Sequence, residues 1–201
     1  MANYVPPATN RFAVITSKKA LLILETSQDT IVLSYQTKLP YLGEKDGQIL
    51  VETPLGIGYL HRDDADVLNS DKNRRPVSGK ELVTSGEVFV GLPYLWGGMS
   101  SFGYDCSGFT YTIHKANGYL IPRDASEQAK GGTPISLHKA EPGDLLFFAY
   151  DEGKGAIHHV GIYYGDGKIL HSPHTGKPIE IIPMDGTIYK KELCAVRRYW
   201  G

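Results

Sequence analysis

The first third of the chain alternates short apolar runs with polar turn residues. Between Phe12 and Val67 these runs are FAVIT, ALLILET, TIVLSY, LPYLGEKDGQILVETP and GIGYLHRDD. Short runs rich in β-branched and aromatic residues, bounded by turn residues, are typical of β-strands. Residues 44–47 (EKDG) have the composition of a hairpin turn. Five short strands in so small a segment predict a small β-barrel.

The next part of the chain has a helical pattern. Residues 78–90 are mixed helical, and 91–93 (GLP) interrupt them. After the glycine-rich loop WGGMSSFGYD, apolar residues recur at helical spacing through CSGFTYTIHKANG, which predicts a helix. A second short helix is predicted to start at Asp124, because Asp124 and Glu127 fit a capping box.

Beyond residues 142–143 the pattern predicts only strands. The runs are DLLFFAY, AIHHVGIYYG, KILHSP, IEIIP and LCAVRRYW. Helices followed by an antiparallel sheet indicate an α+β domain. The polar, proline-closed segment 69–76 (NSDKNRRP) indicates a linker. We therefore predict two domains, a β-barrel with its linker over 1–76 and an α+β domain over 77–201.

Composition excludes several classes of function. The hydrophobic share of 41% and charged share of 21% are typical of a folded globular protein. A net charge of -1 lacks the basic footprint of a nucleic-acid-binding protein. No apolar run approaches the ~20 residues that span a bilayer. The N-terminal sequence MANYVPPATNRF has neither region of an export signal, which predicts a cytoplasmic protein as written, although a trimmed secreted or cell-envelope protein has the same appearance.

Cys106, in YDCSGF, is one of two cysteines. If a helix begins there, Asp105 is its N-cap and the thiol lies in the first turn, where the helix dipole and free N–H groups favour an anion. Helix N-termini lower the pKa of a thiol, so the position predicts a thiolate nucleophile. The same N–H groups are candidate donors to an oxyanion. Cys194, in the last predicted strand, is interpreted as core packing.

A nucleophilic thiol needs a base, and imidazole is the usual one near neutral pH. Four histidines lie in the predicted sheet: His158, His159, His171 and His174. Consecutive strand residues point to opposite faces, so only one of His158 and His159 can reach the site. We predict His159 as the base and His171 as the group that orients it, which is papain-like logic.

Strand register tests that pairing. A three-residue loop at 165–167 (GDG), with Gly167 in a left-handed conformation, places Gly161 opposite His171. His171 is then a diagonal neighbour of His159 on the same face. A two-residue turn instead shifts the register by one and sends His171 to the other face. The chemistry therefore favours the longer loop.

Four segments in order, PYLWGGMSSFGYDCSGF, IPRDASEQ, PGDLLFFA and HHVGIYYGDGKILHSP, resemble the NlpC family of bacterial cell-wall cysteine peptidases over residues 92–199. The resemblance implies a papain-like fold with Cys106, His159 and His171 as catalytic residues and no cofactor. It implies hydrolysis of peptidoglycan stem peptides at the γ-D-glutamyl to diamino acid bond, through a thioester, on fragments with a free N-terminal L-Ala. The phrase LPYLGEKDGQILVETPLGIGYLHRDDADV resembles the bacterial SH3-like domains of cell-wall enzymes.

The resemblance also implies supporting residues around the nucleophile. Tyr94 corresponds to a tyrosine that helps bind the oxyanion. Asp105 and Ser107 match positions that hold the free amine of L-Ala in relatives with SH3-like domains. An acid beside the nucleophile suits an ammonium ligand, and it also suits a helix cap.

The segment IPRDASEQ departs from the family pattern in one position. Arg123 and Asp124 match a substrate-binding motif that in some relatives is followed directly by a serine. Here Ala125 intervenes before Ser126, so Ser126 is the nearest equivalent. Relatives of this type often carry two SH3-like domains, whereas residues 1–76 contain one.

The sequence leaves three alternatives to a cysteine peptidase open. Cysteine and histidine together can bind zinc, although no Cys-x-x-Cys or His-x-x-x-His pattern is present. The same Cys-His-His site can serve a papain-like amidase, or a papain-like acyltransferase in which an amine instead of water resolves the thioester. A third alternative is a cell-wall binding module that carries an inactive hydrolase domain.

Overall fold

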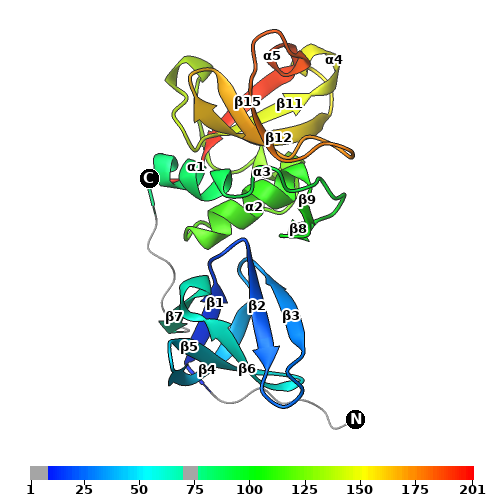
Figure 1. Cartoon of the computed structure of the whole chain (residues 1–201). Helices are drawn as coiled ribbons and strands as arrows, with labels where there is room; N and C mark the ends of the chain where they lie inside the picture. Colours follow the sequence, from blue (N-terminus) through cyan, green and yellow to red (C-terminus); the bar gives the residue numbers. More distant parts are fainter. Residues whose placement is uncertain (1–8, 70–76) are drawn as a thin grey trace. The chain divides into compact units, whose positions relative to one another are not determined.

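The computed structural model describes residues 9–69 and 77–201 (Figure 1). Contacts divide the chain into two compact units, Met1–Asn73 and Arg74–Gly201. The predicted linker 69–76 lies outside the described residues except for Asn69, which ends a strand.

The first unit is a seven-stranded antiparallel sheet. Its strands are β1 (Arg11–Ile15), β2 (Lys19–Leu24), β3 (Thr30–Ser34), β4 (Lys38–Lys45), β5 (Gln48–Thr53), β6 (Gly56–His61) and β7 (Ala65–Asn69). They are ordered β3-β2-β6-β5-β4-β1-β7. The predicted number of five was too low, because residues 39–54 form two strands and β7 follows the acidic turn at Arg62–Asp64. The predicted hairpin turn is present, with both Asp46 and Gly47 at positive φ.

Alternation along these strands builds the core of the first unit. In β2 and β5 every second side chain is buried, which is the pattern of a sheet with one face covered. Leu22, Ile49 and Leu60 belong to one cluster and are almost completely buried. Complete burial of such a side chain stabilises the fold by about 1.5–3 kcal/mol. Strands from across the sheet share this cluster, so the sheet wraps around a single core.

The second unit contains a six-stranded antiparallel sheet. Its strands are β10 (Thr133–Pro134), β11 (Leu145–Ala149), β12 (Ile157–Gly165), β13 (Lys168–His171), β14 (Glu180–Pro183) and β15 (Leu193–Arg198). They are ordered β10-β15-β11-β12-β13-β14. A two-stranded ribbon, β8 (Met99–Ser100) and β9 (Gly103–Tyr104), precedes the second helix. This arrangement confirms the predicted α+β class.

Three helices lie along one face of this sheet, as Figure 1 shows: α1 (Gly79–Glu87), α2 (Cys106–Ala116) and α3 (Ala125–Gln128). Ser78 and Glu81 form a capping box at the start of α1. The capping box predicted at the start of α3 is absent, because the Asp124 side chain makes no cap hydrogen bond there. Only the backbone carbonyl of Asp124 accepts from Glu127, at 3.0 Å.

Two further short helices correct the prediction that only strands follow residue 143. These are α4 (Tyr150–Gly153) and α5 (Ile188–Glu192). A 3-10 turn at Leu137–Lys139 precedes β11. In α4 both Asp151 and Glu152 have φ of 54°, so the segment is a tight left-handed turn between β11 and β12. Segments this short carry no measurable helical periodicity, and the sequence pattern therefore did not reveal them.

Both faces of the second sheet are covered. On the helix side the rings of Phe89, Tyr104 and Phe109 pack edge to face, with centroids 5.6–6.3 Å apart. On the other side Leu146, Phe148 and Ile169 form a separate buried cluster. The central strand β11 is consequently buried at all five positions. A continuous apolar run such as LLFFA suits a strand covered on both faces.

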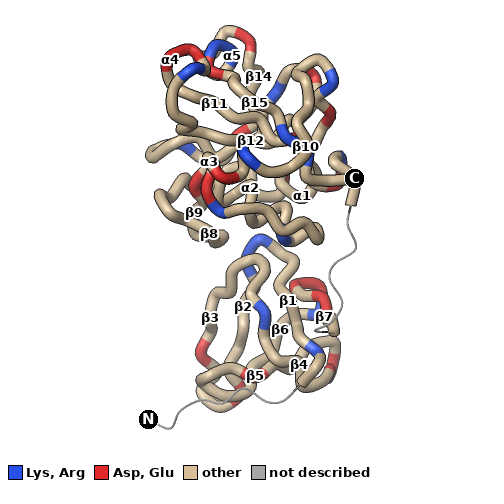
Figure 2. Tube along the Cα trace, turned by 180° about the vertical axis from the view of Figure 1, so that it is seen from behind, with Lys and Arg blue, Asp and Glu red and all other residues tan. Residues whose placement is uncertain are grey.

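Charged residues of both signs lie interspersed along the trace of each unit (Figure 2). Among residues 9–69 and 77–201, no helix is long and apolar enough to cross a membrane.

Candidate active site

Cys106 is the first residue of α2, as the sequence predicted. Asp105 is the N-cap, and its Oδ1 accepts a hydrogen bond from the backbone N–H of Gly108 at 2.6 Å. The Cys106 side chain is half-buried, and Val160 of β12 is among the backbone hydrogen-bond donors that act on its thiol. Since Val160 follows His159 directly, the thiol lies against the strand that carries the predicted base.

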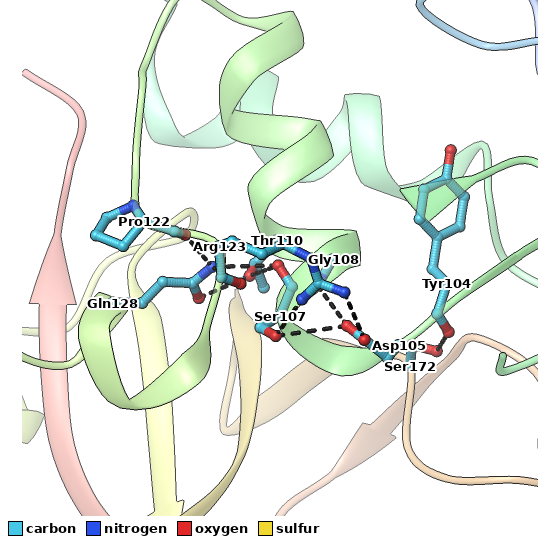
Figure 3. A network of polar contacts seen from close by, with 9 residues as sticks. All are labelled: Tyr104, Asp105, Ser107, Gly108, Thr110, Pro122, Arg123, Gln128 and Ser172. Atoms are coloured by element: carbon cyan, nitrogen blue, oxygen red, sulfur yellow. Dashed lines mark hydrogen bonds and ion pairs between the residues drawn. The ribbon is translucent and has the colours of Figure 1, made fainter. Parts of the chain in front are cut away.

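A second contact holds the same elements together. Ser172 follows His171 directly, and its hydroxyl donates to the backbone carbonyl of Tyr104 at 2.7 Å (Figure 3). Tyr104 lies two residues before Cys106 and is itself buried. The end of β13 and the start of α2 are therefore tied together through a buried hydrogen bond, which is how the fold brings the thiol and the histidines to one place.

The charge state of Cys106 differs from the predicted thiolate. Burial raises the pKa of the thiol above its ordinary value, and the neighbouring Asp105 raises it further. The backbone N–H groups of Val160, Ser107 and Cys106 itself lower it, but they do not outweigh those two effects. The helix N-terminus thus reduces the cost of a thiolate without making it the resting form. A base is therefore needed to convert the Cys106 thiol into a thiolate at neutral pH.

Alkylation of Cys106 by iodoacetamide is expected to accelerate steadily with pH to beyond about pH 9, without a plateau near pH 6. The reason is that only the thiolate reacts, and below the raised pKa its fraction grows about tenfold per pH unit. Rates are measured by mass spectrometry of the Cys106 peptide in a Cys194→Ser background. A plateau near pH 6 that His159→Ala removes would contradict this expectation, because it would reveal a resting thiolate–imidazolium pair.

The predicted imidazole pair is present. His159 on β12 and His171 on β13 are both buried, and His159 Nε2 lies 2.8 Å from His171 Nδ1. Burial lowers the pKa of His159 well below its usual value, and the neighbouring His171, His158 and His174 lower it further. Burial, with a smaller effect of His174, lowers the pKa of His171 to about 4. Both rings are therefore neutral at pH 7, the state in which an imidazole can accept a proton.

The hairpin that pairs these histidines differs from the predicted loop. Asp166 and Gly167 form a two-residue turn with φ of 49° and 69°, and Gly165 pairs with Lys168. The three-residue loop was therefore a wrong prediction, although Gly167 is left-handed as expected. By itself, this shorter turn would direct His171 to the opposite face.

A β-bulge restores the register. Between Tyr163 and Gly165 the pairing shifts by one residue, so that Ile162 pairs with Leu170. Gly161 consequently lies opposite His171, as predicted. A Cβ on Gly161 would approach the Cβ of His171 to 2.9 Å and Cδ1 of Ile169 to 2.5 Å. Glycine at this position leaves the space in which the two rings meet.

Aromatic rings enclose the imidazole pair. Tyr189 of α5 has its ring centroid 5.3 Å from that of His159 and 5.0 Å from that of His171. Phe148, directly opposite His159 in β11, lies 5.7 Å away. Burial raises the pKa of Tyr189 to about 12, with contributions from Glu180, Glu192 and Cys106, so its phenol stays protonated. These rings shield one side of the pair from water.

Arg123 and Asp105 form an ion pair at the N-terminus of α2. Arg123 Nη2 donates to Asp105 Oδ2 at 2.6 Å, and Nη1 donates to the Ser107 hydroxyl at 2.8 Å (Figure 3). The Ser107 hydroxyl in turn donates to Asp105 Oδ1 at 3.4 Å. Three of the predicted substrate-binding residues are therefore joined in one network beside the nucleophile. Charge-assisted hydrogen bonds of this kind are stronger than neutral ones.

Gln128, which the sequence did not single out, anchors that network. It is completely buried, accepts from the hydroxyl of Thr110 at 2.9 Å, and donates to the carbonyls of Ser107 at 3.1 Å and Pro122 at 2.8 Å. The amide thus links α2 to the segment that carries Arg123 (Figure 3). A buried glutamine in an otherwise polar segment has no distinctive sequence signal, since most glutamines are exposed.

The other predicted site residues are Tyr94, Asp124 and Ser126, and they differ in their surroundings. Tyr94 is half-buried, and burial raises its pKa to about 12, with further contributions from the charges of Cys106 and Asp105. The backbone of Tyr94 pairs with that of Tyr104, two residues before Cys106, which places Tyr94 near the start of α2. Asp124 and Ser126 are exposed at the start of α3, and neither side chain hydrogen-bonds to the Asp105–Arg123–Ser107 network.

Two expectations concern Cys194 and the alternative of a metal site. Cys194 is exposed on β15, so its interpretation as core packing was wrong, and its thiol donates to the carbonyl of Phe147 at 3.3 Å. Within the part of the chain that the structure describes, no group of three or more His, Cys, Asp or Glu side chains is arranged to hold a metal ion.

Comparison with known proteins gives two family matches. The profile of the NlpC/P60 family matches residues 91–198. The profile of the YKFC SH3b2 domain matches residues 15–67, which correspond to the seven-stranded sheet.

Curated relatives match nearly the whole chain. A gamma-D-glutamyl-L-lysine dipeptidyl-peptidase of Bacillus subtilis is 50% identical over 193 residues, which are 96% of this chain and 64% of that protein. A protein of the same name from Bacillus cereus is 39% identical over 191 residues, 94% of this chain and 57% of that protein. The chain thus spans less than two thirds of the length of either relative.

A solved structure has the same fold throughout. The crystal structure of an NlpC/P60 family protein from Bacillus cereus superimposes with a TM-score of 0.91 at 38% identity, covering 96% of this chain and 64% of that one. The NlpC/p60 domain of the peptidoglycan hydrolase SagA, 32% identical, covers 61% of this chain with a TM-score of 0.52.

Proposed function

Because the chain belongs to the NlpC/P60 family, we propose that it is a cysteine peptidase that hydrolyses peptidoglycan stem peptides at the bond between γ-D-glutamate and a diamino acid. The single observation that carries the proposal is the neutral imidazole pair, with 2.8 Å between its nitrogens, on the adjacent strands β12 and β13 beside a helix-terminal thiol. The names of the two Bacillus relatives support this substrate class.

The reaction uses the neutral resting state of the pair. His159 engages His171 through Nε2, so Nδ1 is the nitrogen that takes the Cys106 proton as Sγ attacks the amide carbon. The same proton then passes to the amine of the diamino acid as the C–N bond breaks, which leaves a γ-glutamyl thioester on Cys106. Water, deprotonated by His159, hydrolyses the thioester and releases the γ-carboxylate and the free thiol.

Donors near the nucleophile stabilise the oxyanion. The N–H of Cys106 itself is at the N-terminus of α2, where backbone donors lack intrahelical partners. Tyr94 adds a hydroxyl whose raised pKa of about 12 keeps it protonated at neutral pH. A fixed neutral donor beside a developing negative charge is the arrangement that accelerates acyl transfer.

Asp105 is the group that binds the free amine of L-Ala in this proposal. One of its oxygens already accepts from Arg123, and a carboxylate oxygen has room for a second hydrogen bond. The guanidinium compensates much of the negative charge, so the attraction for an ammonium group is reduced. We therefore infer a preference for free over blocked N-termini, without complete exclusion of blocked ones.

Three peptides test the proposed reaction: L-Ala-γ-D-Glu-L-Lys, its N-acetylated form, and an isomer with the ordinary α-linkage. Hydrolysis, followed by mass spectrometry, is expected for the γ-linked peptide and absent for the α-linked control. Acetylation is expected to lower kcat/KM about tenfold, since it removes one charged hydrogen bond whose strength Arg123 has already reduced. Equal rates for free and acetylated peptides would contradict the role of Asp105. Inertness of both γ-linked peptides would refute the function itself.

A further inference from the structure

One nitrogen of the imidazole pair has no hydrogen-bond partner within the described residues. His171 is completely buried, and while its Nδ1 contacts His159, its Nε2 has no hydrogen bond. A buried polar atom without a partner is destabilising, and such atoms are rare in folded proteins.

The protons on the two rings are coupled. For His159 to act as a base through Nδ1, its own proton must be on Nε2, where it donates to His171 Nδ1. A neutral His171 that accepts at Nδ1 must then carry its proton on Nε2. In the opposite arrangement His171 donates from Nδ1, the proton of His159 moves to its Nδ1, and the base is lost. Activity thus depends on which nitrogen of His171 is protonated.

Glu180 faces that nitrogen. It is the residue of β14 directly opposite His171 in the antiparallel pairing, and its Oε1 lies 3.7 Å from His171 Nε2. Its side chain is 31% exposed, so a rotation of the partly solvated carboxylate closes the remaining gap. We propose that Glu180 is a positioning residue that accepts the Nε2 proton of His171 and thereby holds His159 in the tautomer that can deprotonate Cys106.

The other groups around His171 do not replace this acceptor. Tyr189 packs edge-on against the ring and keeps its phenol proton, because burial raises its pKa to about 12. His174 carries no carboxylate, and its Nδ1 lies 2.9 Å from the carbonyl oxygen of Thr175. Glu192 is engaged elsewhere, with its Oε2 3.0 Å from His158 Nε2. Of the carboxylates in this part of the sheet, Glu180 is the one in an ion-pair contact with His171.

Nitrogen-15 NMR of the histidine-labelled protein tests the proposal without any substrate, because protonated and unprotonated ring nitrogens have distinct chemical shifts. Wild type and Glu180→Gln are expected to show His159 and His171 both protonated at Nε2, since an amide oxygen also accepts. In Glu180→Leu a large fraction of both rings is expected to carry the proton at Nδ1.

Hydrolysis of the γ-linked peptide is the second measurement, and this part rests on the proposed function. Glu180→Leu is expected to lower kcat at least about tenfold, as for other changes that misplace a catalytic histidine proton. Glu180→Gln is expected to retain activity within about fivefold. The matched control is Glu192→Gln, which removes the carboxylate beside His158 and should leave kcat/KM within about twofold of wild type.

The NMR and hydrolysis measurements distinguish a failure of the proposed Glu180 role from a failure of the proposed function. The role of Glu180 would be overturned if His171 of the wild type carried its proton at Nδ1. It would also be overturned if Glu180→Leu left the tautomers of the two histidines, or kcat, unchanged. If wild type cleaves neither γ-linked peptide, the proposed function fails, and the tautomers still decide the role of Glu180.

Discussion

Replacing Cys106 by serine is expected to abolish hydrolysis of L-Ala-γ-D-Glu-L-Lys, with a loss of kcat/KM of at least about 10³-fold. The thiol already rests in its neutral form because burial and Asp105 raise its pKa, and a hydroxyl is a far weaker acid than a thiol. A neutral histidine whose own pKa is lowered cannot ionise it efficiently. The measurement is turnover at pH 7, with protein folding checked by thermal unfolding.

The matched control for this change is Cys194→Ser. The Cys194 thiol is exposed on β15 and contacts a backbone carbonyl that a hydroxyl can equally reach. Activity and melting temperature should both stay close to those of wild type. Turnover that survives in Cys106→Ser, or is lost only in Cys194→Ser, would show that the nucleophile lies elsewhere.

Replacing Arg198 by methionine is expected to lower the free energy of unfolding of the second unit by about 3–5 kcal/mol. Asp144 is completely buried before β11, and its two oxygens accept from Arg198 Nε at 2.7 Å and Nη2 at 2.9 Å. Without the guanidinium, a buried carboxylate keeps only the backbone N–H of Glu141 as a partner, at 2.9 Å. Thermal and urea unfolding of the variant measure this loss.

Two further variants show whether burial is responsible. Lys130→Met removes an ion pair of similar length, 2.6 Å to Glu127, whose side chains are both largely exposed, and it should cost less than about 0.5 kcal/mol. Asp144→Asn combined with Arg198→Met should recover part of the stability, because the buried negative charge is then gone. Equal losses for the buried and exposed pairs would contradict this interpretation.

Local patterns in the sequence predicted several parts of the site correctly. Asp105 followed by CSG is a helix N-terminus, and the helix begins at Cys106. The alternation along β12 limited the base to one of two adjacent histidines, and His159 is the one that contacts His171. Both results depend on periodicity and capping, which act over a few residues.

The charge state of the thiol and the contacts between residues far apart in the sequence could not be predicted from local patterns. The thiol was expected to be a thiolate, but its burial follows from packing against β12, which no local pattern reveals. Glu180 meets His171 only through the β13–β14 pairing. The connection 172–179 between these strands includes a turn at Thr175 and Gly176, but it is too long for that turn alone to set their register. Tyr189 belongs to a five-residue helix too short for periodicity to reveal, yet it covers both histidines.

The bulge at residues 163–165 keeps His159 and His171 on the same face of the sheet, although the hairpin has a two-residue turn. Successive side chains along a strand point to opposite faces, so deleting one residue from this hairpin while the turn stays intact would move the side chains of one strand to the other face of the sheet. The geometry of the imidazole pair therefore depends on whether the number of residues at the hairpin tip is odd or even, although the tip itself supplies none of the chemical groups of the site. A change of one in the number of these tip residues is not compatible with the site unless the bulge changes with it.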